Sequence, residues 1–179
     1  MAADSRYHLA QYNLARLLAP LDDPRIADFV ADLHRVNELG DRAPGFVWRL
    51  QTDDGTSTSV RVRGDPLIVV NLTVWESVES LFEFTYRSGH AEVYRRRREW
   101  FEAPAEAYLV LWWVPAGHTP TVEEGDERLD YLRARGPTPH AFTFKQRFPP
   151  PGEQRATPAA GAPPECGGWC CAGTPRSRG

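Results

Sequence analysis

Residues 67–75 read Leu-Ile-Val-Val-Asn-Leu-Thr-Val-Trp, and this stretch decides the fold. Nearly all of its residues are β-branched or otherwise apolar, which predicts a central strand of a sheet. Because side chains alternate between the two faces of a strand, one face is purely aliphatic and the other is mixed. The aliphatic set is Ile68, Val70, Leu72 and Val74, and the mixed set is Val69, Asn71, Thr73 and Trp75. We expect the aliphatic face to pack under helices and the mixed face to line an interior.

Further elements are indicated on both sides of this strand. Helix starts are marked by Asp23 before Pro24, by Ser77, and by Thr121 with Glu124 three residues later. The first helix is expected to end at Leu39-Gly40. The expected strands are 8–18, 46–51, 67–75, 107–114 and a short one over 141–145, and the expected helices are 24–39, 77–87, 90–101 and 121–135.

The order of these elements predicts an α+β fold of the ferredoxin-like class. A strand-helix-strand unit occurs twice, and the two units are joined strand to strand, which is the βαββαβ sandwich. One further helix follows at the C-terminal end. Helices on one side would leave the other face of the sheet bare, and large apolar surfaces are rarely left to water. We therefore expect two copies to close face to face as a homodimer, forming a dimeric α+β barrel.

Composition divides the chain into one domain and a tail. Residues 1–147 carry all the predicted elements, whereas residues 148–179 are rich in Pro, Ala and Gly and predict a disordered tail. The formal net charge is −3 and no apolar run reaches membrane-spanning length, so we expect neither nucleic acid nor a membrane as a partner. The N-terminus lacks the apolar segment of a secretory signal, and the predicted domain has no cysteine. Both features predict a cytoplasmic protein.

His90 is the first candidate for chemistry. It follows Ser88-Gly89, where one helix is expected to break and the next to begin. An imidazole with a pKa of about 6.5 can act as a base, orient a substrate or ligate haem iron. A structural role at the helix junction is the plain alternative, and the sequence offers no second haem-specific motif.

A group of tryptophans and amides forms the second candidate. A cavity lined by aromatic rings and a few amides suits an aromatic or apolar small molecule. A packed core with amides paired to one another is the alternative, because an unpaired buried amide is costly. The candidate substrate-binding residues are Asn13, Trp48, Asn71, Trp75 and Trp112.

Several other polar groups are expected to have surface roles. The run Arg95–Arg98 spreads around a helix, so most of it should face solvent, while Arg96 or Arg97 could enter the site and bind a carboxylate or phenolate. His118 and His140 are expected in loops. The tail cysteines Cys166, Cys170 and Cys171 do not have zinc-site spacing, so no metal is expected.

Five stretches resemble an uncharacterised bacterial family of the dimeric α+β barrel superfamily, which includes the antibiotic-biosynthesis monooxygenases. They are LAQYNLARL (9–17), PGFVWRLQTDDG (44–55), VNLTVWESVESLFEFTYRSGH (70–90), RRREWFE (96–102) and LVLWWVPAGHTPTVEEGDERLDYLRARGPTPHAFTFK (109–145). The resemblance covers about residues 9–145 and implies the barrel fold. It implies no single activity, because the superfamily includes cofactor-free oxygenases, haem enzymes, small cyclases and non-catalytic members.

Three functional hypotheses follow. The first is a cofactor-independent, monooxygenase-like enzyme that acts on an aromatic or apolar small molecule, with His90 as base or orienter. In it, Asn13 and Asn71 would position a carbonyl or enolate, and Trp48, Trp75 and Trp112 would form the walls. The second is a non-catalytic dimer that binds small molecules or is structural, and the third is a haem-binding barrel that uses His90.

Overall fold

The computed structural model describes residues 6–153 of the chain. Its strands are β1 (Tyr7–Arg16), β2 (Phe46–Arg49), β3 (Ile68–Trp75) and β4 (Leu109–Pro115), and its helices are α1 (Ala27–Asp41), α2 (Val78–Arg87), α3 (His90–Arg96) and α4 (Val122–Arg135). Short 3₁₀ turns precede α1 (Pro24–Ile26) and follow α3 (Arg97–Glu99). The predicted tail lies outside the described residues from residue 154 on, as do its three cysteines.

The helix starts follow the capping residues that the sequence indicates. The Asp23 carboxylate accepts from the backbone N–H of Arg25, Ser77 Oγ from that of Ser80, and Thr121 Oγ1 from that of Glu124. These bonds satisfy N–H groups that a helix leaves unpaired in its first turn.

The predicted end of the first helix and the predicted fifth strand differ from the structure. Gly40 lies inside α1 and packs against the Phe84 ring, so it does not end that helix. Within the described residues, the segment expected to be a fifth strand forms only two isolated bridges, Phe142 with Leu111 and Ala141 with Thr138.

The four strands form one antiparallel sheet in the order β2-β3-β1-β4. With one helix between β1 and β2 and two between β3 and β4, this order is the ferredoxin-like topology. The predicted fold class is therefore confirmed, including the added C-terminal helix. The register places Leu9 opposite Trp75, Gln11 opposite Thr73 and Asn13 opposite Asn71.

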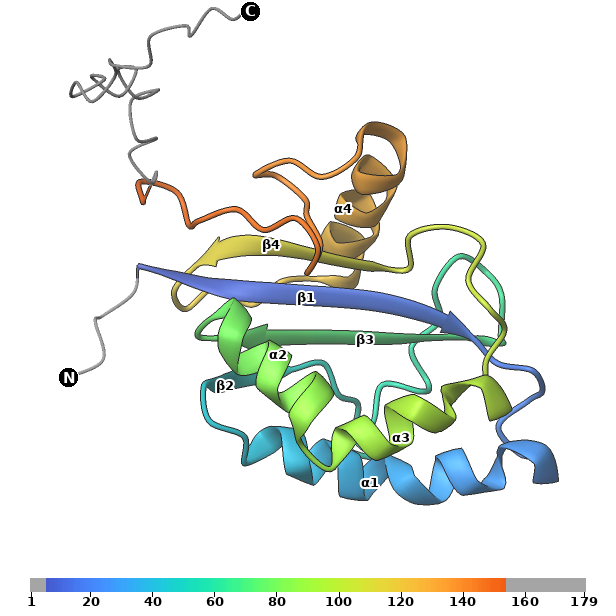
Figure 1. The fold of residues 1–179 in the computed structure, drawn as a ribbon. Coiled ribbons are helices and arrows are strands. Elements are labelled where there is room, and N and C mark those ends of the chain that lie inside the picture. Colours follow the sequence, from blue (N-terminus) through green and yellow to red (C-terminus); the bar gives the residue numbers. More distant parts are fainter. Residues whose placement is uncertain (1–5, 154–179) are drawn as a thin grey trace, which may run out of the picture.

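Helices cover both faces of the sheet (Figure 1). α4 lies on one side, and α1, α2 and α3 lie on the other. The aliphatic residues of β3 face α4, in a cluster that also contains Leu129 and Leu132 of that helix. The mixed residues Asn71, Thr73 and Trp75 face α1–α3 within the same chain. The expectation that the mixed face is bare and awaits a second subunit is therefore wrong.

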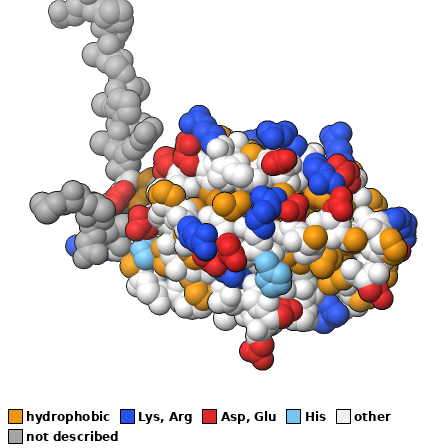
Figure 2. Space-filling view, turned by 90° about the horizontal axis from the view of Figure 1, so that it is seen from below, with side chains coloured by type: hydrophobic (Ala, Val, Ile, Leu, Met, Phe, Trp, Pro, Cys, Tyr) orange, Lys and Arg blue, Asp and Glu red, His pale blue; other side chains and the backbone are white. Residues whose placement is uncertain are grey.

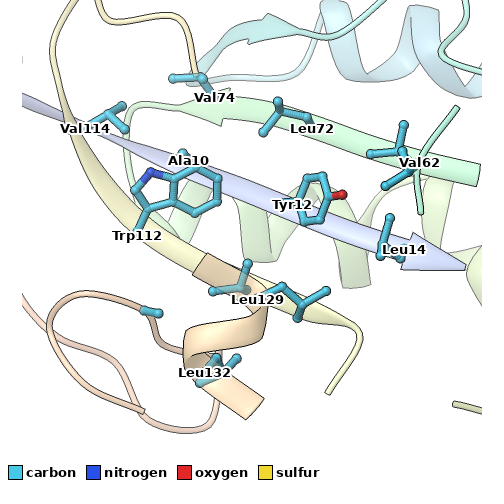
Figure 3. Packing of buried hydrophobic residues seen from close by; sticks show 13 residues of the cluster. Ala10, Tyr12, Leu14, Val62, Leu72, Val74, Trp112, Val114, Leu129 and Leu132 are labelled. Atoms are coloured by element: carbon cyan, nitrogen blue, oxygen red, sulfur yellow. The ribbon is translucent and has the colours of Figure 1, made fainter. Parts of the chain in front are cut away.

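The cluster under α4 is tightly packed (Figure 3). Tyr12 and Trp112 are both 0% exposed, and each uses its polar atom on α4. The Tyr12 hydroxyl donates to Asp126 over 2.9 Å, and Trp112 Nε1 donates to Glu124 over 3.0 Å. Val62 completes the cluster from the connection between β2 and β3. A single chain therefore buries the aliphatic face under a helix, as the sequence predicts, and that helix is α4.

The molecular surface mixes charges of both signs. Figure 2 shows basic and acidic side chains interleaved with hydrophobic atoms on the face seen from below in Figure 1. Several of these charges pair across elements, for example Arg96 of α3 with Asp28 of α1. In the part of the chain that the structure describes, no helix has the length and apolarity needed to cross a membrane.

We predict that Gly125→Ala destabilises the protein. A Cβ at Gly125 would lie 2.4 Å from Tyr12 Cδ2, so the helix or the ring must shift, and overpacking of this kind costs about 1–3 kcal/mol. Gly40→Ala is the matched control, because its Cβ would lie 3.4 Å from Phe84, at ordinary contact distance, and alanine favours the helix by up to about 1 kcal/mol. Urea unfolding should show loss for the first variant and no loss for the second; equal stabilities would contradict the packing argument.

Candidate functional site

A cavity of about 710 Å³ lies between the mixed face of the sheet and helices α1–α3. Its volume suits a small organic molecule. Most of its helical wall is apolar. The apolar residues from the three helices include Phe29, Leu33, Val36, Leu81, Phe84 and Val93. α1 therefore uses its apolar side chains to line a space rather than to fill it.

A row of hydrogen-bonded polar side chains crosses the floor of this cavity. At its centre is Gln11, which is 3% exposed and whose Oε1 accepts from Thr73 Oγ1 over 2.8 Å and from Asn71 Nδ2 over 3.3 Å. Gln11 Nε2 donates to Asn13 Oδ1 over 2.7 Å, and Trp75 Nε1 donates to Thr73 Oγ1 over 2.8 Å. The row follows from the register of β1 on β3, which brings these polar residues side by side.

The row has unused hydrogen-bonding capacity at one end. Asn71 Nδ2 donates to both Gln11 and Asn13, but Asn71 Oδ1 accepts no hydrogen bond from residues 6–153. Asn13 Nδ2 likewise has no partner among these residues, because Asn13 takes part only through Oδ1. Both residues line the cavity. At this end, Asn71 Oδ1 can therefore accept a hydrogen bond from a ligand and Asn13 Nδ2 can donate one.

His90 also lines the cavity, where α3 begins. Its ring packs on Phe84 at 4.9 Å and on Tyr94 at 6.2 Å between centroids. Burial lowers the pKa of His90, and the hydrogen bond to the Thr85 carbonyl oxygen opposes this less strongly. The ring is therefore neutral at pH 7.

The hydrogen bond to Thr85 also fixes the tautomer of His90. Nδ1 lies 3.2 Å from the Thr85 carbonyl oxygen, which can only accept, so Nδ1 carries the proton. The lone pair is then on Nε2, which has no hydrogen-bond partner among residues 6–153. A neutral imidazole with a free Nε2 can accept a proton or bind a metal ion.

Of the tryptophans predicted to form the walls, Trp75 alone belongs to this cavity. Trp75 is 1% exposed, stacks on Phe84 at 5.1 Å and meets the edge of Phe46. Trp48 and Trp112 pack into the cluster on the other side of the sheet, so the expectation that they wall the same cavity is corrected.

The physical reasons for the two misplacements differ. In β2, a bulge between Phe46 and Trp48 breaks the simple alternation, so Phe46 and Arg49 line the cavity and Trp48 does not. In β4, Trp112 lies opposite Ala10, which belongs to the face that α4 covers.

The structure adds Gln11 and Tyr108 to the residues that the sequence reasoning selected, and it places Thr73 of the mixed face in the cavity lining, as expected. Gln11 lies two residues before Asn13 and therefore on the same face of the strand, so the two-residue period was a usable signal for it. Tyr108 reaches the cavity from just before β4, and its hydroxyl lies 3.1 Å from that of Tyr94. No local pattern in the sequence indicates this pairing.

The two histidines that were predicted to lie in loops, His118 and His140, are not part of the cavity lining. His118 is paired with Glu124 through Nε2 over 2.9 Å, and His140 contacts Arg128. Among the residues that the structure describes, no group of three or more histidine, cysteine or carboxylate side chains could hold a metal ion.

Several solved structures are similar to this chain at low identity. SnoaB, a cofactor-independent oxygenase from Streptomyces nogalater, is 17% identical with a TM-score of 0.42, over 63% of this chain and 95% of that one. A putative antibiotic biosynthesis monooxygenase from Chloroflexus aurantiacus J-10-fl is 16% identical with a TM-score of 0.40, over 64% and 98%. A conserved protein from Methanosarcina mazei Go1 is 13% identical with a TM-score of 0.42, over 62% and 93%. Similarity at this level does not assign a reaction to the chain.

The sequence itself matches one family. No curated protein matches the chain. The model of a domain of unknown function, DUF3291, matches residues 8–158, which include every strand and helix described above except the first residue of β1. This match confirms the uncharacterised family that the sequence resembles. The chain therefore belongs to the DUF3291 family.

Proposed function

We propose that the protein is a cofactor-independent, monooxygenase-like enzyme that binds an aromatic or otherwise apolar small molecule in the cavity between the sheet and α1–α3. The observation that carries this proposal is His90, a neutral imidazole with a free Nε2 in the wall of a largely apolar cavity. Asn13 and Asn71 offer a free donor and a free acceptor on the floor of the same cavity. The arrangement contains a base and polar groups that could orient a substrate.

The proposed chemistry uses electrons from the substrate. His90 Nε2 accepts a proton from an acidic CH₂ group beside a carbonyl, which leaves a carbanion whose charge is delocalised onto the oxygen. The carbanion reduces O₂, the two combine to a hydroperoxide, and loss of water gives a new carbonyl. The balance is R₂CH₂ + O₂ → R₂C=O + H₂O, so no external reductant is needed. The chain would provide orientation, the base and an apolar site.

The amide row would stabilise the charge that develops during this reaction. Asn13 Nδ2 can donate a hydrogen bond to an enolate oxygen, and such fixed donors are more effective in an apolar site than in water. The buried Gln11 fixes the position of Asn13 through a 2.7 Å hydrogen bond. Gln11 is therefore proposed as a positioning residue and Asn13 as the group that touches the substrate.

A non-catalytic binding role for the same cavity is the second candidate. The observation that favours it is that Gln11 and Thr73 are already paired within the amide row, as a structural network would be. Substrate binding without O₂ consumption would support this candidate. Haem binding through His90 is tested separately, by adding haemin and recording whether a Soret band forms and is lost in His90→Ala.

The proposed assembly is a homodimer, although the cavity is lined by residues of one chain. Light scattering tests this directly, because one chain has a mass of 20.2 kDa. A mass of one chain would remove the dimer from the proposal and leave the site unchanged.

We predict that His90→Ala lowers O₂-dependent turnover of a compound with an acidic CH₂ group, such as anthrone, by about 10²–10⁴-fold, because a general base is lost. Asn71→Ala should weaken binding, measured by tryptophan fluorescence, because the cavity loses an amide. His140→Ala is the matched control, since His140 lies away from the cavity. Unchanged binding and turnover in both site variants would refute the site assignment.

We also predict the pH dependence of kcat/KM. The base form of His90 is the neutral one, and burial lowers its pKa below the ordinary value of about 6.5. The value of kcat/KM should therefore be constant at alkaline pH and fall to half of its maximum only below pH 6.5, where His90 gains a proton. A profile that is already falling between pH 8 and pH 7 would contradict His90 as the base.

A further inference from the structure

Arg97 is a cation in the wall of the cavity that is not paired with any carboxylate of residues 6–153. It belongs to the 3₁₀ turn that follows α3, and its guanidinium lies 4.3 Å from the centroid of the Tyr94 ring. Its one hydrogen bond among residues 6–153 runs from Nη1 to the Tyr94 carbonyl oxygen over 3.0 Å. A guanidinium has five N–H donors in a planar fork, so four remain for other partners.

Other arginines of the cavity lining are neutralised by ion pairs. Arg16 pairs with Asp65 and Glu102, Arg49 with Asp41, and Arg133 with Glu106. Within the described residues, no carboxylate lies within ion-pair distance of Arg97. Its neighbour Arg98 is also without one but is exposed to solvent. Arg97 is half-buried and is therefore less screened by water than a surface arginine.

Two tyrosine hydroxyls accompany Arg97 at this end of the cavity. The Tyr94 and Tyr108 oxygens are 3.1 Å apart, so one hydroxyl donates to the other, and Tyr86 also lies against Tyr94. When Tyr94 donates to Tyr108, the proton of Tyr108 is left for a ligand. Burial raises the pKa of Tyr108, the hydrogen bond to Tyr94 raises it further, and the charge of Arg97 acts in the opposite direction. Tyr108 thus stays protonated at neutral pH and can donate to a ligand that Arg97 also contacts.

We propose that Arg97 and the Tyr94–Tyr108 pair form an anion subsite, so that the substrate class is an aromatic carboxylate. The apolar wall would hold the ring, and Arg97 would bind the two carboxylate oxygens through its planar fork. The tyrosine pair would donate a further hydrogen bond. This inference rests on the proposed function, because it assumes that the cavity binds an aromatic molecule.

The test compares acids with their neutral amides. Binding of benzoate, 2-naphthoate and anthracene-2-carboxylate, each against its amide, is measured by tryptophan fluorescence on the full chain, where Trp75 lines the cavity. In the unsubstituted protein, at least one acid should bind ten times more tightly than its amide. Arg97→Gln should remove this preference because it weakens acid binding much more than amide binding, and Arg97→Lys should keep part of the preference.

Arg95→Gln is the matched control. Arg95 is exposed, lies on the same helical segment and carries the same charge, but it is not part of the cavity lining. It should keep the full preference for acids, so a loss equal to that of Arg97→Gln would mean that overall charge is responsible and would overturn the assignment. Thermal unfolding of each variant shows whether a loss of binding reflects a loss of fold.

The outcomes separate this inference from the proposed function. Equal binding of acids and amides would overturn the anion subsite and leave the cavity as a binding site for aromatic molecules. Binding of none of the six compounds by the folded protein would overturn both. Preference for acids, together with no O₂ consumption on anthrone, which has the acidic CH₂ group that these six compounds lack, would support the subsite and count against the oxygenase proposal.

Discussion

The pairing of β1 with β3 is the constraint on which the rest of the structure depends. Its register places Gln11 opposite Thr73 and Asn13 opposite Asn71, so one face of the sheet carries a continuous row of polar groups. The same register places Tyr12 opposite Leu72 on the other face, among aliphatic side chains. A shift of one residue would exchange the two faces, exposing amides to an apolar core and apolar groups to the cavity. The site and the core therefore specify the same register.

The two sides of the sheet differ because their helices contact it differently. α4 lies directly on the sheet, since Gly125 has no side chain where the Tyr12 ring passes. α1 leaves a space that its apolar residues line without filling. Gly89, before α3, allows close contact with Leu39 of α1, so the two helices support each other beyond the sheet. The close packing of α4 provides a rigid base for a cavity that is open enough to hold a ligand.

Much of the fold could be predicted from the sequence, and the candidate site only in part. Long apolar strands and capped helices are local patterns, and β3 and α4 follow them closely. The alternation of side chains also showed that the two faces of β3 differ. It could not show which helices cover each face, because that depends on how α4 packs against the sheet. The bulge in β2 places Trp48 and Phe46 on opposite faces of the sheet, and no residue type in this strand indicates a bulge. His90, Asn13, Asn71 and Trp75 do share one cavity, whereas the Tyr94–Tyr108 contact depends on tertiary structure.

The two outer strands bear on how copies of this protein behave at high concentration. β4 forms backbone hydrogen bonds in both directions between Leu111 and Phe142, so part of its free edge is occupied by its own chain. β2 has only four residues and an irregular register, which gives a foreign strand little to pair with. Unprotected strand edges are common starting points for aggregation. The bulge in β2 that directs Trp48 away from the cavity therefore also limits edge-to-edge strand pairing between two molecules.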